Sequence, residues 1–158
     1  MADLVTVRNL ILASVKLPAQ LVSHADVERA VEQALIKLNQ RTGGQIINTQ
    51  SPLPGMTILR DPVLDPSQVY LIATGLGLYV GQVPWTLANV DQHQGAWRYF
   101  IDLAVEYTHV AVCGRLAIAD GFNEMPFNLE FRSIYEQAFQ RIADIDRDIQ
   151  ENWLIGVI

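Results

Sequence analysis

The chain has 158 residues, of which half are hydrophobic, and a formal net charge of −6. This length fits one domain with enough apolar side chain for a core. The acidic balance argues against a protein that grips nucleic acid through clustered lysines and arginines. Charged residues make up 18% of the chain, fewer than the roughly 25% of a typical globular domain, which is a hint that part of the surface is covered in an assembly.

Targeting signals are absent from the sequence pattern. The single cysteine, Cys113, excludes an intrachain disulfide, so the fold does not depend on an oxidising compartment. Met1 to Lys16 lack the basic start and cleavage site of a signal peptide. The longest apolar run, Val69 to Val83, is interrupted by glycines and is shorter than the roughly 18 residues of a membrane span. We therefore expect no membrane association, and a protein that is intracellular or part of a particle assembled inside a cell.

Two helices are predicted in the first third of the chain. Leu4 to Val15 has helical spacing, although its valines and threonine leave a strand open, and Pro18 ends it in either case. Ser23 can cap the next helix, with Asp26 as a weaker capping-box partner, and the glycines at 43–44 can end it. Its apolar stripe consists of Val27, Ala30, Val31, Ala34, Leu35 and Leu38.

The segment from Gln45 to Asp65 has a different character. Its β-branched pieces are short, and prolines prevent a continuous helix and tolerate only edge strands. We predict an extended arm or a loose β-hairpin. A segment this long is often an interaction element, and an ordinary surface loop is the alternative. The prolines that bracket it are Pro52, Pro54, Pro62 and Pro66.

The next segment has a good helix start at Asp65-Pro66-Ser67-Gln68. We predict a short apolar helix that reaches about Val80 and stops at Gly81. The glycines within it weaken this prediction by about 1 kcal/mol each, and a buried strand from Val69 to Thr74 is the alternative. Residues 82–94 are interpreted as a connection.

Two long helices are predicted to close the chain. Gly95 to about Ala119 is apolar on most of its circumference, which is typical of a central helix. After a turn at Asp120 to Asn123, a second helix from Pro126 to Trp153 has a narrow apolar seam and a charged outer face. A turn this short makes the two helices pack antiparallel. The seam consists of Phe127, Phe131, Ile134, Tyr135, Ala138, Ile142, Ile145, Ile149 and Trp153.

The predicted fold is therefore mainly α. We expect a single domain over residues 1–158, built as a four- to five-helix bundle with a long C-terminal helical hairpin. The arm at 45–65 and a C-terminal tail at 154–158 lie outside that bundle. The helix from Val69 to Val80 and the stripe of the second helix are expected to pack beside the central helix.

No pattern in the chain matches a catalytic or cofactor site well. Glu106-Tyr107-Thr108-His109 is half of a di-iron motif, but such a site needs a second copy and two further glutamates. Gly75-Leu76-Gly77 imitates a dinucleotide fingerprint, yet Gly81 comes one residue too late and no βαβ alternation surrounds it. We expect no nucleotide, metal or other cofactor.

The remaining reactive residues also favour structural roles. The three histidines (His24, His93 and His109) are scattered and lack metal-ligand spacing. Cys113 lies in an apolar helix, where a cysteine usually acts as a small core residue, although its spacing from His109 permits contact. We therefore do not expect an enzyme.

The order of elements resembles the head-to-tail adaptor proteins of tailed bacteriophages, called tail tubular proteins in short-tailed phages. The resemblance lies first in Val7 to Val15, Pro18 and the helix from Ala25 to Gln40. Family members tend to end the first helix in a Leu-x-Ser-Ile-Gly-like turn, which reads Leu-Ala-Ser-Val-Lys-Leu-Pro here, without the glycine. Asp120 to Asp148 resembles the closing hairpin of these proteins, with Met125-Pro126 near a helix start.

The resemblance implies a structural virion protein of the phage neck. Such a protein forms a ring, commonly a dodecamer, that docks below the portal protein and continues the DNA channel into the tail. It encloses DNA without sequence-specific binding and has no catalytic residues. The arm and the apolar tail are then expected to contact neighbouring proteins. The candidate interface residues are Ile46, Ile47, Met56, Ile58, Leu154, Ile155, Val157 and Ile158.

Other classes of protein remain open at this point. A tail terminator or tail-completion ring is a close neighbour within the same particle. A helical interaction module that binds a protein partner as a dimer is a second class. A metal-dependent four-helix enzyme that uses Glu106 and His109 is a third, which metal analysis of the purified protein would reveal.

Overall fold

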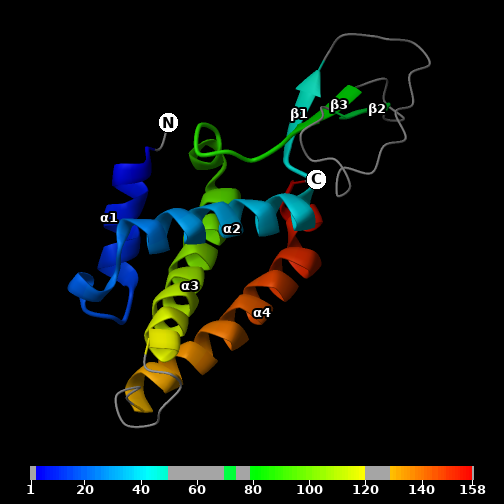
Figure 1. Cartoon of the computed structure of the whole chain (residues 1–158). Helices are drawn as coiled ribbons and strands as arrows, with labels where there is room; N and C mark the ends of the chain where they lie inside the picture. Colours follow the sequence, from blue (N-terminus) through cyan, green and yellow to red (C-terminus); the bar gives the residue numbers. More distant parts are fainter. Residues whose placement is uncertain (1–2, 50–69, 74–78, 120–128, 158) are drawn as a thin grey trace.

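The computed structural model describes residues 3–49, 70–73, 79–119 and 129–157. This part of the chain is mainly helical, as predicted, and the helices pack into one body (Figure 1). None of its helices is long and apolar enough to cross a membrane. The helices are α1 (Leu4–Ser14), α2 (His24–Thr42), α3 (Gln94–Ala119) and α4 (Leu129–Val157), with short 3-10 turns η1 (Ala19–Leu21) and η2 (Val90–Gln92).

Capping side chains fix the starts of the first two helices. Asp3 accepts a hydrogen bond of 2.7 Å from the backbone N–H of Thr6, so Leu4–Ser14 is helical and not a strand. The predicted capping box of α2 is present: the Asp26 N–H donates to the Ser23 hydroxyl and the Ser23 N–H donates to the Asp26 carboxylate. Gly43, at φ 74°, ends α2 in the left-handed conformation that glycine adopts without strain.

Helix α3 lies at the centre of the body, as its wide apolar surface predicts. Between residues 95 and 117, only Arg98 and Arg115 are exposed. Phe100 and Leu103 are fully buried at its middle. Helices α1, α2 and α4 all pack against α3. Helix α2 crosses α3, and α4 runs back along it as the second arm of the predicted hairpin (Figure 1).

Three strands correct the prediction for the middle of the chain. The predicted helix reaching Val80 is wrong, because β2 (Tyr70–Ala73) and β3 (Tyr79–Val83) are strands. The alternative, a strand from Val69 to Thr74, is confirmed for the residues that the structure describes, 70–73. Both strands are rich in β-branched and aromatic residues, which favour a pleated surface, and the intervening glycines disfavour a helix. A helix in this segment therefore does not pack beside α3.

The predicted arm begins as a strand whose partner comes from elsewhere in the chain. β1 (Gln45–Thr49) pairs antiparallel with β3, so that Ile47 lies opposite Gly81. β3 also pairs antiparallel with β2, and the strand order is β1-β3-β2. The rest of the arm, including Met56 and Ile58, lies outside the described residues. Figure 1 shows the sheet beyond one end of the helical body.

The last helix is longer at its C-terminus than predicted. α4 continues through Val157, so residues 154–157 extend the helix and do not form a separate tail. Leucine and isoleucine continue a helix readily, and a glycine this close to the end disturbs it little. The predicted start at Pro126 and the turn before it lie outside the described residues. All described seam residues of α4, from Phe131 to Trp153, are buried or half-buried.

Two ion pairs lie on the charged outer face of α4. Arg132 Nε lies 3.4 Å from Glu136 Oε1, four residues later. Arg147 instead pairs with Asp144 at 2.7 Å, one turn earlier, and not with Glu151. The preference follows from helix geometry, since a basic residue placed before its acidic partner is the poorer orientation for an i, i+4 pair.

Candidate functional site

The Glu106-x-x-His109 pair lies inside the helical body. His109 Nδ1 lies 3.2 Å from Glu106 Oε2, and both residues are more than nine-tenths buried. His109 Nε2 accepts a hydrogen bond of 3.0 Å from the backbone N–H of Lys16, in the segment between α1 and α2. Arg141 Nε, on α4, lies 3.1 Å from Glu106 Oε1. This cluster therefore ties the α1–α2 connection to α3 and α4.

Both ring nitrogens of His109 are occupied in this cluster. Because Nε2 accepts a hydrogen bond and so carries no proton, the ring proton lies on Nδ1, which donates a hydrogen bond to Glu106. No lone pair is then left for a metal or for general-base catalysis. Within the part of the chain that the structure describes, no group of three or more His, Cys, Asp or Glu residues could hold a metal ion.

A surface cavity of about 220 Å³ borders the same cluster. Lys16, Asp102 and Arg141 line it together with the Glu106–His109 pair. Burial raises the pKa of Asp102, an effect that Arg98 and Arg141 oppose. The carboxylates and the cations around the cavity balance each other, and we assign it no ligand.

The other residues considered for chemistry also occupy structural positions. Cys113 is fully buried in α3, and burial raises the pKa of its thiol to about 11, which keeps it protonated. Gly81 lies in β3, between two antiparallel neighbours, which is not the parallel βαβ setting of a dinucleotide fingerprint. Gly75 and Gly77 lie outside the described residues. His24 is exposed in the first turn of α2.

The most elaborate polar contacts lie where the sheet joins the helical body. Asn39, on α2, holds the backbone of Trp85: its amide donates to the Trp85 carbonyl at 3.0 Å and its oxygen accepts from the Trp85 N–H at 2.6 Å. The Trp85 indole N–H donates to the Thr42 hydroxyl at 3.0 Å. Trp85 follows β3 by two residues, so these bonds fix the exit of the sheet against the end of α2.

The same threonine also closes the entrance to the sheet. The Thr42 hydroxyl donates to the Leu38 carbonyl at 2.7 Å and accepts from the N–H of Gly44 at 3.1 Å. Gly44 directly precedes β1. One buried hydroxyl therefore contacts both connections between the body and the sheet.

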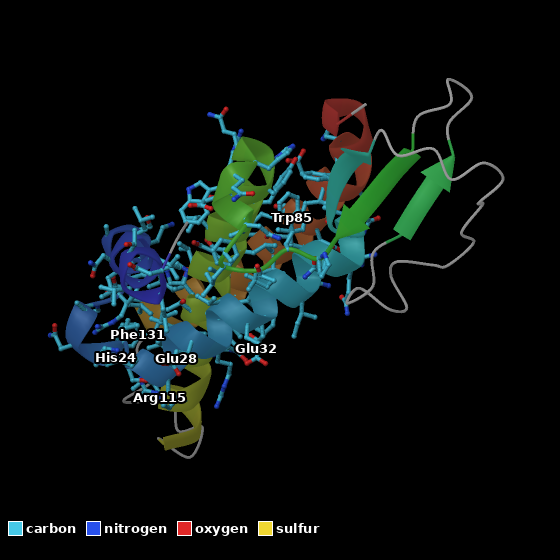
Figure 2. The ribbon with its side chains drawn as sticks, turned by 90° about the horizontal axis from the view of Figure 1, so that it is seen from above. His24, Glu28, Glu32, Trp85, Arg115 and Phe131 are labelled. Carbon is cyan, nitrogen blue, oxygen red and sulfur yellow. The ribbon has the colours of Figure 1, made fainter. Side chains whose placement is uncertain are left out.

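Aromatic rings complete this region. Trp153, near the end of α4, meets Trp85 edge to face with ring centroids 6.0 Å apart, and His93 lies 5.0 Å from Trp153 and 5.8 Å from Trp85. Arg41 and Asp146 add a contact of 2.6 Å between α2 and α4. We call Asn39, Thr42, Trp85, His93 and Trp153 the junction. Viewed from above, Trp85 lies toward the sheet, away from His24 and Glu28 at the start of α2 (Figure 2).

The junction brings the two predicted interface elements together. Ile46 and Ile47 lie in β1, which begins beside Gly44, and Leu154 to Val157 form the last turn of α4, directly after Trp153. Figure 1 shows the end of α4 near the base of β1. Ile158 lies outside the described residues. Segments that are more than a hundred residues apart in the sequence thus end at one face of the body.

The junction was not predicted from the sequence, which assigned residues 82–94 to a plain connection and gave only Trp153, as a seam residue of the last helix. One signal pointed to this region: Trp153 directly precedes the predicted interface segment 154–158. Tryptophan carries a large apolar surface and one donor, so it usually marks a packed position. Asn39 and Thr42 gave no signal, because polar residues near a helix end are also common on exposed surfaces.

The chain was compared with protein-family models, with curated proteins and with solved structures, and no match was found.

Proposed function

We propose that this chain is a structural head-to-tail adaptor of a tailed-phage neck. In this proposal, copies form a ring that joins the portal to the tail and continues the DNA channel through which the genome leaves the head. The chain carries no catalytic residues in this role. Three features support the proposal: the junction, the composition of the strands and the acidic charge.

The observation that carries the proposal is the Trp85–Trp153 contact, with 6.0 Å between ring centroids. It brings the sheet and the apolar end of α4 to the same end of a compact helical body. Apolar segments gathered at one end of a protein favour contact with partner chains. A subunit with one contacting end and a stable body suits a ring that is clamped between two larger assemblies.

The strands themselves are suited to pairing with a neighbour. None of the residues in β1, β2 and β3 is charged, and none is a proline. Monomeric proteins usually protect exposed strand edges with such residues. With the order β1-β3-β2, β1 and β2 each keep one edge that no other described strand occupies. Two different edges on one subunit favour head-to-tail contacts, which close into a ring when the rotation allows.

The charge of the chain fits a conduit for DNA. A net charge of −6 repels the phosphate backbone and keeps the duplex from adhering to the wall. We therefore expect no gel shift with duplex DNA at physiological salt. A tight, salt-dependent complex with DNA would contradict this part of the proposal.

Mass photometry of the purified chain, alone and with a portal ring, tests the proposal. We expect ring-sized particles, with central openings in electron micrographs. A stable dimer at all concentrations, without portal binding, would favour a helical interaction module. Rings that bind the end of a tail tube and not the portal would favour a tail terminator.

A triple substitution tests the role of the C-terminal turn of α4. Leu154→Gln, Ile155→Gln and Val157→Gln together remove apolar surface while keeping residues that favour a helix. We expect these changes, like deletion of residues 154–158, to reduce ring formation and to leave the helical circular-dichroism signal intact. Glu28→Gln with Glu32→Gln, on the exposed face of α2, is the matched control. Normal ring formation by the triple variant would show that the C-terminal turn is not part of the interface.

A further inference from the structure

His93 caps helix α3 with its ring. Its backbone is extended, at φ −122° and ψ 116°, and its carbonyl accepts the first helical hydrogen bond from the Trp97 N–H at 2.9 Å. The N–H of Ala96 donates to His93 Nδ1 at 3.1 Å. An imidazole nitrogen accepts a hydrogen bond only when it carries no proton, so this cap requires neutral His93 with its proton on Nε2.

The sequence around His93 is fitted to this conformation. A Cβ atom on Gly95 would lie 3.2 Å from His93 Cε1 and 3.8 Å from the Trp153 ring, so a glycine gives the imidazole room to fold back over the helix start. The ring then packs against both Trp85 and Trp153, with 5.8 and 5.0 Å between centroids. One imidazole thus contacts the exit of β3, the start of α3 and the end of α4.

Protonation reverses the chemistry of this contact. A proton on Nδ1 turns the acceptor into a donor that faces the N–H of Ala96, and it places a positive charge at the positive end of the helix dipole. We propose that protonation of His93 opens the junction, freeing the segment after β3 and the last turns of α4 from the start of α3. The junction is then a pH-sensitive latch on the sheet and the C-terminal turn.

The charges around His93 do not remove this effect. The charged groups nearest to the junction residues in the sequence are Asp91, two positions before His93, and Glu151, two positions before Trp153. Arg98 follows on α3, and Arg41 is paired with Asp146. The Trp153 ring lies tilted by 46° against the imidazole and offers some cation–π attraction. A fully protonated imidazole only donates, so it can no longer accept from the N–H of Ala96.

A second observation lowers the cost of opening the junction. The Trp153 indole N–H is buried without a hydrogen-bond partner. A buried donor without a partner loses its hydration and gains nothing in return, and opening would return it to water. The closed junction therefore depends on its remaining contacts, among which the His93 cap is the one that a proton on Nδ1 would break.

Amide hydrogen exchange of the full chain between about pH 8 and 5, the range in which histidine titrates, tests the latch. After correction for the intrinsic exchange rate, we expect exchange at Ala96 and Trp97 to rise several-fold on acidification in the wild-type protein. His93→Asn caps a helix without titrating and should abolish the rise. His24→Asn, which changes an exposed histidine on α2, should keep it.

Two readouts separate the effect of His93 from that of the buried His109 and from misfolding. Protonation of His109 Nε2 would remove the acceptor of the Lys16 N–H, so exchange at Lys16 reports on His109 and not on the junction. In the unmodified protein, the rise at Ala96 must follow the NMR titration of the His93 ring, which keeps the test decisive if the variant misfolds. Flat wild-type exchange at Ala96, or a rise that persists in His93→Asn, would overturn the proposal.

Discussion

Asn39 forms two hydrogen bonds with the backbone of Trp85, at 2.6 and 3.0 Å, across 46 positions of sequence. An amide side chain that pairs with a main-chain N–H and C=O imitates one step of a β-ladder. It thereby ends the sheet against a helix without leaving buried backbone groups unsatisfied.

Removal of this amide should therefore destabilise the whole body. Asn39→Ala leaves the N–H and carbonyl of Trp85 without partners, and we expect a loss of about 3 kcal/mol in the free energy of unfolding. Urea unfolding followed by circular dichroism measures it. Gln40→Ala, at the exposed neighbouring position, is the control and should change little. Equal effects of the two substitutions would mean that the Asn39 bonds add nothing.

The two junction tryptophans should respond differently to the same substitution. Trp85→Phe loses the hydrogen bond to Thr42, whereas Trp153→Phe removes an N–H that has no partner. We expect Trp153→Phe to be the milder change, by about 1 kcal/mol or more, and Trp153→Ala to cost about 3–5 kcal/mol. Thermal and urea unfolding of the three variants check this order. A more harmful Trp153→Phe would contradict the unsatisfied indole.

The helix features that depend only on neighbouring residues were predicted correctly from the sequence. The Ser23–Asp26 capping box and the stop at Gly43 lie within one helix, and the apolar stripes of α3 and α4 repeat every turn, so local pattern was sufficient. The strands were harder to predict, because β3 pairs with β1, 30 to 38 residues upstream, and the glycine-broken sequence of β3 also fits a short helix. The end of α4 was misplaced because nothing local marks where an apolar helix stops.

The junction could not be predicted from local sequence patterns, for a different reason. Each of its bonds joins residues that are distant in the chain, such as Trp85 to Thr42 and Trp153 to His93. Asparagine, threonine and histidine have many solvated roles, and only the packing of the whole body selects one. The absence of a metal at Glu106 and His109 remains a prediction, and the structure adds that both ring nitrogens of His109 have hydrogen-bonding partners.

The Glu106 carboxylate joins His109 and Arg141, and its replacement should be graded. Glu106→Gln keeps an oxygen that accepts from His109, whereas Glu106→Ala leaves a buried imidazole N–H without an acceptor. We expect about 1–3 kcal/mol of destabilisation for the alanine variant and less for glutamine. Chemical unfolding gives the comparison. Elemental analysis of the same samples should find no stoichiometric metal, and bound iron or zinc lost in Glu106→Gln would contradict our reading of the cluster.

The Asp26 carboxylate predicts a loss of stability in acid. Burial raises its pKa, but hydrogen bonds from the Ser23 backbone and from Arg115 outweigh burial and leave the pKa below its usual value. A lowered folded-state pKa contributes stability above the unfolded-state pKa, near 4, and that contribution is lost as pH falls further. Unfolding midpoints between about pH 6 and 3 should fall less steeply in Asp26→Asn than in the wild type. Glu28→Gln, exposed on the same helix, is the control, and parallel slopes for all three proteins would refute the linkage.

Cys113 offers a probe of opening of the body. Its thiol is fully buried, and burial raises its pKa to about 11, so only about one thiol in a thousand is ionised at pH 8 in the folded protein. We expect labelling by a thiol reagent to require unfolding. Asn39→Ala, if it costs about 3 kcal/mol, should then raise the labelling rate roughly a hundredfold under native conditions. Rapid stoichiometric labelling of the wild-type protein would place Cys113 at the surface. Equal labelling rates in the wild type and Asn39→Ala would show that Cys113 becomes accessible by a local motion that the junction does not control.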